Sequence, residues 1–184
     1  MNLDDLIRVM ADFFKRFKVD HFTFGAVAMN FWIPPRFTYD LDVVLCIDKG
    51  ALPYLVKELN KLGFKITSAL QRKLGEGRLI KLPIDDTELD LKLYSYSHDY
   101  EAFQRAQKFV QGQFTISVAS AEDIVLYKLQ YWRRQDQADV ERILAEYKPL
   151  DRKYIEAWLD QVEEETGFQV KKRWKGLLRG EFVE

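Results

Sequence analysis

The chain has 184 residues, which is the size of one domain or of a domain with a small appendage. Hydrophobic residues make up 47% and charged residues 31%, a globular composition with enough apolar material for a core. Lys and Arg (28) nearly balance Asp and Glu (29), which argues against the strongly basic class of nucleic-acid binders. A local basic face stays open.

The few cysteine and histidine residues exclude two further classes. Cys46 is the sole cysteine, so no disulfide can form within the chain, and we interpret it as a small hydrophobic residue. His21 and His98 are too few to indicate a zinc cluster. The first residues resemble no signal peptide, and no apolar run reaches the length of a membrane span. We therefore expect a cytoplasmic protein with no membrane contact.

The first two thirds of the chain alternate between helix and strand patterns. Apolar residues three or four apart predict helices, and apolar β-branched runs between turn residues predict strands. In chain order we expect a helix over 3–17, a strand over 22–25, a short helix over 26–32, a strand over 38–47, a helix over 52–62, a strand over 64–68, a hairpin of 78–82 and 88–94, a helix over 100–108 and a strand over 115–118.

After residue 118 the strand signals stop. Ser120 has the form of a helix cap before an apolar helix that runs to residue 132, and further helices are expected over 136–147 and 151–166. The charged tail over 171–184 has no clear pattern. The sequence thus predicts an α/β (α+β) fold, a mixed sheet flanked by helices, with a core over 1–118 and a C-terminal helical region over 119–184 packed on that core.

Three aspartates form the candidate site. Residues i and i+2 of a strand project from one face, so Asp40 and Asp42 point the same way. Asp90 lies on the polar face of the hairpin strand, with Glu88 as a possible substitute, and joins the pair if this strand lies beside theirs. Hard oxygen ligands of this kind suit magnesium, and two-metal phosphoryl chemistry needs such a cluster.

The position of the pair matters more than its composition. In a chain with this many acids, acid-x-acid pairs arise by chance roughly four or five times. Asp40 and Asp42, however, begin a very apolar strand, where an unpaired carboxylate is costly unless a cation compensates it. A metal site and a purely structural pair both stay open on the residues alone.

The order of these motifs resembles the active-site signature of the nucleotidyltransferase superfamily. The matching segments are Gly25-Ala26, then Arg-Phe-Thr-Tyr-Asp-Leu-Asp over 36–42, then Leu-Asp-Leu over 89–91. The lead-in over 36–40 is similar to that of small bacterial members related to the AbiEii toxin group. Lys128-Leu129, followed by Arg-Arg-Gln-Asp-Gln-Ala-Asp-Val over 133–140, resembles their C-terminal helix pair. The resemblance covers about residues 20–148.

The resemblance implies a nucleotidyltransferase core that transfers a nucleoside monophosphate from an NTP, with Mg²⁺ or Mn²⁺ as cofactor. The acceptor would be a nucleic acid, such as tRNA or another RNA, or a protein, and a cognate antitoxin is an expected partner. Metal binding and catalysis would fall to Asp40, Asp42 and Asp90, and nucleotide binding to Gly25, Ala26, Arg36 and Lys128.

Other interpretations of the chain and of its candidate residues stay open. Active members often carry Ser or Gly where Ala26 stands, so a catalytically silent protein that binds a nucleotide or a partner is a second hypothesis. A metal-binding α/β domain of another chemistry, such as a nuclease, is a third. Lys128 also fits a surface lysine that extends over the core. The charged residues over 133–139 are spaced for salt bridges between or within helices.

Overall fold

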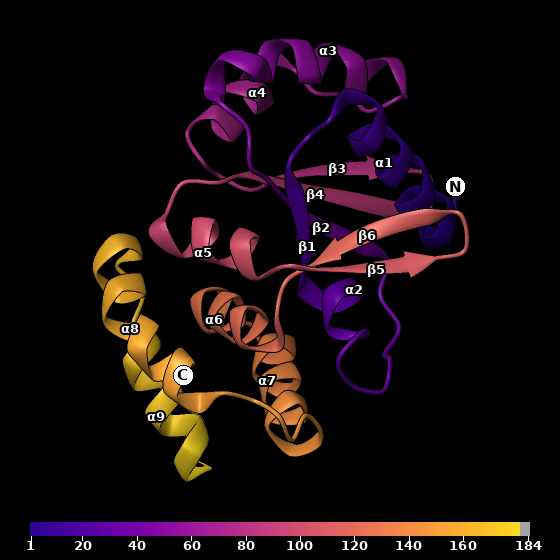
Figure 1. Cartoon of the computed structure of the whole chain (residues 1–184). Helices are drawn as coiled ribbons and strands as arrows, with labels where there is room; N and C mark the ends of the chain where they lie inside the picture. Colours follow the sequence, from indigo (N-terminus) through magenta and orange to yellow (C-terminus); the bar gives the residue numbers. More distant parts are fainter. Residues whose placement is uncertain (181–184) are drawn as a thin grey trace.

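The computed structural model describes residues 1–180 and is built around one mixed sheet (Figure 1). Within the described residues the sheet has six strands in the order β3-β4-β2-β1-β6-β5. Their bounds are β1 His21–Phe24, β2 Asp40–Leu45, β3 Ile80–Ile84, β4 Thr87–Leu93, β5 Gln107–Gln111 and β6 Phe114–Val118. β1 and β2 are antiparallel, whereas β4 runs parallel to β2. The expected mixed sheet flanked by helices is confirmed.

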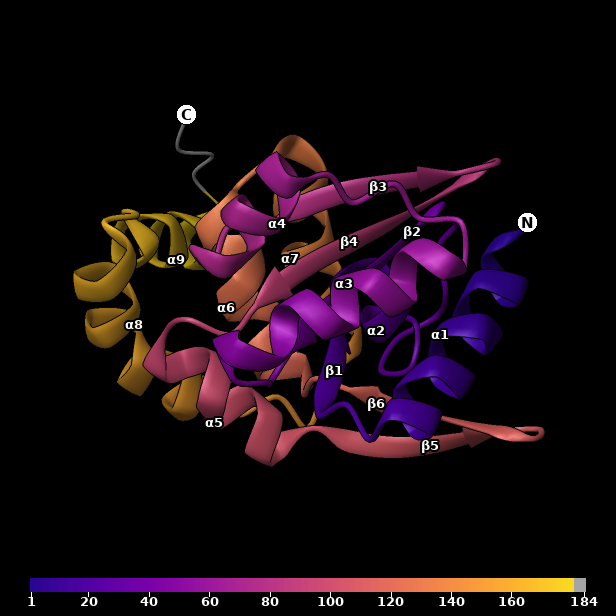
Figure 2. The ribbon, with the colours of Figure 1, turned by 90° about the horizontal axis from the view of Figure 1, so that it is seen from above.

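Helices cover both faces of this sheet (Figures 1 and 2). On one side lie α1 (Leu3–Phe17), α3 (Leu52–Lys61) and α4 (Ser68–Gly75), and on the other lie α2 (Gly25–Met29), α6 (Ala121–Tyr131) and α7 (Arg134–Glu146). α1 begins where the Asn2 side chain accepts a hydrogen bond from the Asp5 amide at 2.9 Å, and it buries Leu6 and Met10 against the sheet. The predicted helix over 3–17 is confirmed.

The predicted strand over 64–68 is wrong. Phe64 and Ile66 are both buried, which produces the alternation of a strand, but no strand of residues 1–180 pairs with this segment. Instead the Asn60 side chain accepts a hydrogen bond from the Ile66 amide at 2.8 Å and donates one to the Ile66 carbonyl at 3.1 Å. Neither backbone group is therefore available to pair with a neighbouring strand. Thr67 then caps α4 through the Leu70 amide.

The segment after residue 96 also differs from the prediction. α5 (Ser97–Arg105) ends before residue 108, and β5 follows as an edge strand paired only with β6 within the described residues. All side chains of β5 are exposed except Phe109, so the segment lacks the apolar alternation that identifies a strand. An edge strand whose two faces are both exposed to solvent therefore cannot be predicted from a pattern of apolar residues.

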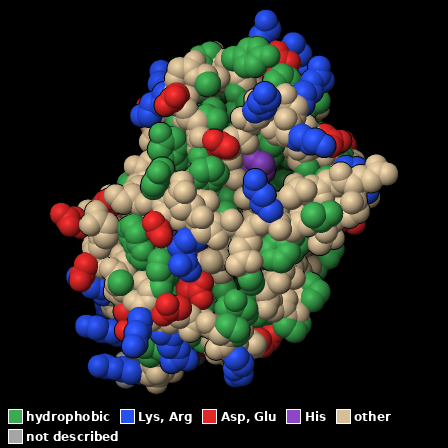
Figure 3. Space-filling model, viewed as in Figure 1, with side chains coloured by type: hydrophobic (Ala, Val, Ile, Leu, Met, Phe, Trp, Pro, Cys, Tyr) green, Lys and Arg blue, Asp and Glu red, His purple; other side chains and the backbone are tan. Residues whose placement is uncertain are grey.

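Beyond residue 118 the described chain is helical, as expected. α6 begins at the predicted cap, where Ser120 accepts from the Asp123 amide, and its residues from Ala121 to Gln130 are all buried. α7, α8 (Arg152–Thr166) and α9 (Val170–Arg179) follow, and the last four residues of the predicted C-terminal region lie outside the described residues. Figure 3 shows basic side chains gathered over α9. No helix of residues 1–180 is both long enough and apolar enough to cross a membrane.

Candidate active site

Asp40, Asp42 and Asp90 come together at one end of the sheet. The parallel register of β2 and β4 sets Asp42 beside Asp90, and the polar faces of both strands point the same way. One carboxylate oxygen from each of the three lies within 4.8 Å of the other two. Glu88 is not part of this cluster and pairs with Lys81 instead.

The cluster carries more negative charge than its surroundings neutralise. Burial, followed by the charges of Asp40 and Asp90, raises the pKa of Asp42 to about 8. Burial also raises the pKa of Asp90 to about 6, although Lys81 contacts its Oδ2 atom at 2.9 Å. The Oδ1 atom of Asp90 is buried and has no hydrogen-bond partner among the described residues. A bound cation resolves both the repulsion and the unpaired oxygen.

Gly25 leaves the space that the Asp42 carboxylate occupies. The residue has a φ of +70°, and a Cβ atom placed on it would lie 2.0 Å from Oδ2 of Asp42. Phe24, the last residue of β1, pairs with Asp42 in the antiparallel register, which brings the two backbones together. From the sequence, Gly25 was expected to let the backbone approach the phosphates closely. The structure adds that any side chain at this position would displace Asp42. Ala26, next in the chain, is buried and lines the same pocket.

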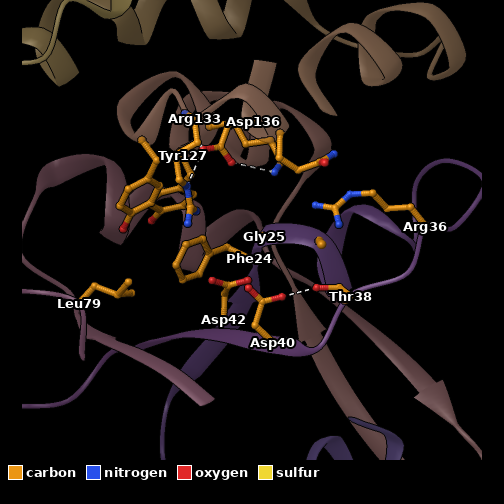
Figure 4. Close-up of a pocket in the computed structure, with 14 residues that line it drawn as sticks. Phe24, Gly25, Arg36, Thr38, Asp40, Asp42, Leu79, Tyr127, Arg133 and Asp136 are labelled. Carbon is orange, nitrogen blue, oxygen red and sulfur yellow. Dashed lines mark hydrogen bonds and ion pairs between the residues drawn. The ribbon is translucent and has the colours of Figure 1, made fainter. Parts of the chain in front are cut away.

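A pocket of about 200 Å³ opens over these residues (Figure 4). Figure 4 shows Asp40 and Asp42 on one side of it, Arg133 and Asp136 on the other, and Arg36 at its edge. Its lining combines acids, cations and rings: Phe24, Gly25, Ala26, Arg36, Thr38, Asp40, Asp42, Leu79, Tyr127, Lys128, Tyr131, Arg133, Gln135 and Asp136. The pocket thus offers an acidic wall for a metal and a basic wall for a phosphate chain.

The basic wall is held by two buried carboxylates of α7. Lys128 is 4% exposed, so its interpretation as a surface lysine is wrong. Its Nζ atom lies 2.6 Å from Asp139 and 3.4 Å from Asp136. Arg36 donates to both oxygens of Asp139, each at 2.8 Å. The expected salt bridges of Asp136 and Asp139 are therefore present, and they extend to two cations of the pocket.

Arg133, Gln135 and Asp136 all line the pocket but were not assigned to it from the sequence. Arg133 was expected only in helix salt bridges, and it does pair with Asp136 at 3.0 Å. It also lines the pocket, because the chain reverses at Trp132, whose φ is +55°. A tryptophan in the left-handed region carries no sequence signal, since glycine and asparagine are the usual residues there.

This arrangement defines the class of fold. A glycine at the end of one strand, an Asp-x-Asp pair on its antiparallel neighbour and a third Asp on the next parallel strand stand in one mixed sheet, and the chain has the nucleotidyltransferase fold. Among solved structures, ANT(2")-Ia in complex with adenylyl-2"-tobramycin aligns at a TM-score of 0.57 and 14% identity, over 92% of this chain and 97% of that one.

Two further structures align to a similar extent. The lincosamide antibiotic adenylyltransferase LnuA, lincomycin-bound, gives a TM-score of 0.55 at 14% identity over 79% of this chain and 98% of that one. An antigenic nucleotidyltransferase-like protein from Paracoccidioides brasiliensis gives 0.53 at 16% identity, over 100% and 94%. No protein-family model and no curated protein matches the sequence. At these identities the likeness establishes the fold.

Proposed function

We propose that this protein is a metal-dependent nucleotidyltransferase that transfers a nucleoside monophosphate from an NTP to an acceptor. One observation carries the proposal: the carboxylates of Asp40, Asp42 and Asp90 converge within 4.8 Å, and Asp40 and Asp42 line a pocket whose opposite wall is basic. A triphosphate with bound metal needs both the acidic cluster and the basic wall, because the metal requires oxygen ligands and the phosphate charge must be matched by cations.

The three aspartates fit Mg²⁺ or Mn²⁺. They supply only oxygen ligands, the pKa of Asp42 is raised to about 8 by burial, and the buried Oδ1 of Asp90 lacks a hydrogen-bond partner among the described residues. Asp40, Asp42 and Asp90 would hold the metal. Once bound, a divalent cation neutralises the triphosphate and polarises the phosphoryl oxygens.

The chain's own residues then bind and orient the reactants. Arg36 and Lys128 contact the triphosphate, and the backbone at Gly25 and Ala26 approaches it closely. The acceptor oxygen forms a bond to the α-phosphorus, the bond from that phosphorus to the β-phosphate oxygen breaks, and pyrophosphate leaves. Asp90 takes the acceptor's proton as a general base.

The proposal also extends to the acceptor and to the biological role. Because segments 36–40 and 128–140 resemble the AbiEii-related group, we propose a cytoplasmic toxin–antitoxin or phage-defence role, with a cognate antitoxin as partner. An RNA acceptor, including tRNA, is supported by the basic side chains gathered over α9 (Figure 3). A protein acceptor is the alternative outcome of the test below.

One residue favours a second candidate function. Ala26 lines the pocket and is 4% exposed, and its methyl group offers no hydroxyl to a phosphate. A protein of the same fold that binds a nucleotide or a partner without transfer would tolerate this residue. The two functions differ in whether label moves from a nucleotide to an acceptor.

The deciding experiment is a transfer assay with α-labelled NTPs. Each NTP is incubated with the protein and Mg²⁺, with total RNA, purified tRNA or a protein extract as acceptor. We expect label on one acceptor class with the wild type and none with Asp40→Asn/Asp42→Asn. The variant Asp85→Asn/Asp86→Asn, in the hairpin turn outside the pocket, should behave as wild type.

The remaining outcomes separate the hypotheses. Metal-dependent NTP binding without transfer to any acceptor rejects the enzyme in favour of the second candidate. The absence of both rejects nucleotide chemistry at this site. Metal-dependent shortening of the RNA, with no label gained, indicates a nuclease.

A further inference from the structure

One buried carboxylate holds two of the cations that line the pocket. Asp139 of α7 is 0% exposed, and its two oxygens accept four hydrogen bonds. Arg36 donates to each oxygen at 2.8 Å, Lys128 to Oδ2 at 2.6 Å and Gln135 to Oδ1 at 3.0 Å. Arg36 stands 103 positions away in the chain, so this contact joins the loop before β2 to the C-terminal helices.

The two cations keep donors that Asp139 does not use. A guanidinium has five N–H bonds and an ammonium three. Arg36 directs two of its own at Asp139 and one at the Phe37 carbonyl, at 3.0 Å. Lys128 directs one at Asp139 and a longer one at Asp136. Both side chains line the pocket, where the other donors can meet an anion.

The backbone of the Arg36 loop is held separately. The Asn30 side chain accepts from the Arg36 amide at 3.0 Å and donates to the Arg36 carbonyl at 2.9 Å. Arg142 donates to the Pro34 carbonyl at 2.7 Å. A change at Asp139 therefore leaves the loop anchored. Its main effect is that the Arg36 guanidinium and the Lys128 ammonium are no longer held in one orientation.

We propose that Asp139 is a positioning residue, which aims Arg36 and Lys128 at the polyphosphate of the bound nucleotide without contacting it. This inference rests on the proposed function, because it names the group that organises the same site. Cations fixed in advance contribute more to binding than mobile ones, since their ordering does not oppose association.

The chain offers a matched control for a merely structural role. Asp123 of α6 is also 0% exposed and accepts from Ser120, Arg105 and Tyr154 in addition to its contact with His98. None of these residues lines the pocket. Replacing either aspartate breaks a buried charged network of similar size, so both variants lose stability, but only the change at Asp139 alters the basic wall.

The experiment measures binding of inorganic triphosphate in the presence of MgCl₂ by titration calorimetry. This probe has the phosphate chain of a nucleotide and no base. We expect Asp139→Asn to weaken binding about tenfold or more, the usual range for groups that orient a ligand's contacts. Asp123→Asn should bind within about twofold of wild type, and Mn²⁺ alone should bind all three proteins equally.

Two further variants address the direction of the guanidinium. Arg36→Lys keeps the charge but loses the two-pronged contact with Asp139, so we expect most of the loss seen with Arg36→Met. Adding Arg36→Met to Asp139→Asn should cost less than the product of the two single effects, because both act through one side chain. These changes are at a partly exposed residue, so they remain informative even if Asp139→Asn fails to fold.

Each contrary result has a distinct meaning. Wild-type affinity in Asp139→Asn or in Arg36→Lys overturns the positioning role and leaves the proposed function standing. An equal loss in Asp123→Asn also overturns it, since the effect is then one of stability. If wild-type protein binds neither Mg²⁺ with triphosphate nor any NTP, the proposed function itself fails.

Discussion

The Asp42 carboxylate occupies the volume in which a side chain at Gly25 would stand. The distance from Oδ2 of Asp42 to a Cβ atom on Gly25 would be 2.0 Å, well below any contact distance. Because φ at Gly25 is +70°, a side chain is disfavoured by the backbone as well. The chain must therefore follow β1 with a residue that has no side chain if Asp42 is to join Asp40 and Asp90.

Gly25→Ala should destabilise the protein and abolish metal binding. We expect a loss of about 3 kcal/mol in the free energy of unfolding, from left-handed backbone strain plus overpacking. Gly112→Ala is the control, because its φ is +61° but nothing lies within 4 Å of a Cβ atom there. It should lose about 1 kcal/mol by backbone strain alone and retain Mn²⁺ binding. Urea denaturation and Mn²⁺ titration test both; a Gly25→Ala protein that binds Mn²⁺ normally contradicts the steric argument.

The metal-free protein should lose stability as the pH rises toward 8. Burial raises the pKa of Asp42 to about 8, whereas the unfolded chain releases this proton near 3.8. Between those values the folded state binds more protons, so the free energy of unfolding falls with increasing pH. The stabilisation that the protonated Asp42 gives the folded state is fully present below about pH 3.8 and is lost as the pH passes 8.

Asp42→Asn isolates the effect of this one carboxyl group. The amide removes the charge, so we expect the variant to be more stable than wild type near pH 8 by the order of a few kcal/mol, without added metal. The two proteins should converge at acidic pH. Denaturant titrations between pH 5 and 8.5 in EDTA measure the difference, and a variant less stable than wild type at every pH would refute the prediction.

Metal binding should release protons from the cluster. The pKa of Asp42, raised by burial to about 8, and that of Asp90, raised by burial to about 6, leave protons that a metal must displace at neutral pH. We therefore expect the affinity for Mn²⁺ to increase from pH 6 to pH 8. Calorimetry in two buffers of different ionisation enthalpy counts the released protons. A pH-independent affinity, with no buffer dependence, would show that the aspartates are already ionised.

The acidic cluster could be predicted because it depends on strand periodicity. Asp40 and Asp42 are two residues apart, and Asp90 lies on the polar face of a strand with alternating leucines, so their common direction follows from the sequence. The adjacency of the two strands is a topological fact, and the resemblance to a known signature supplied it. The helix cap at Ser120 could be predicted as well, since it depends on local hydrogen bonds.

What could not be predicted depends on contacts between distant residues. The Asn60 side chain removes Ile66 from any strand, which the apolar alternation there does not reveal. Arg36 and Asp139 meet across 103 positions, and spacing within a helix says nothing of such a pair. The left-handed turn at Trp132 places Arg133 in the pocket without the residue types that mark such turns.

The predicted division into 1–118 and 119–184 stays a prediction, and truncation tests its energetic meaning. α6 is buried from Ala121 to Gln130 and carries Tyr127 and Lys128 of the pocket. A chain ending at residue 118 loses this helix, so we expect no cooperative unfolding transition and no binding of magnesium triphosphate. Circular dichroism with a urea titration measures the first. A cooperative transition in the shortened chain would mean that the core is independent of the C-terminal region.

The proposed metal and nucleotide site is tested most directly by locating Mn²⁺ and a nucleotide in crystals. Crystals grown with MnCl₂ and a non-hydrolysable NTP analogue allow the metal to be identified by its anomalous scattering. We predict Mn²⁺ density in contact with the carboxylates of Asp40, Asp42 and Asp90, with the triphosphate extending toward Arg36 and Lys128. Nucleotide bound elsewhere, or a cluster of three aspartates without metal at saturating Mn²⁺, would contradict it.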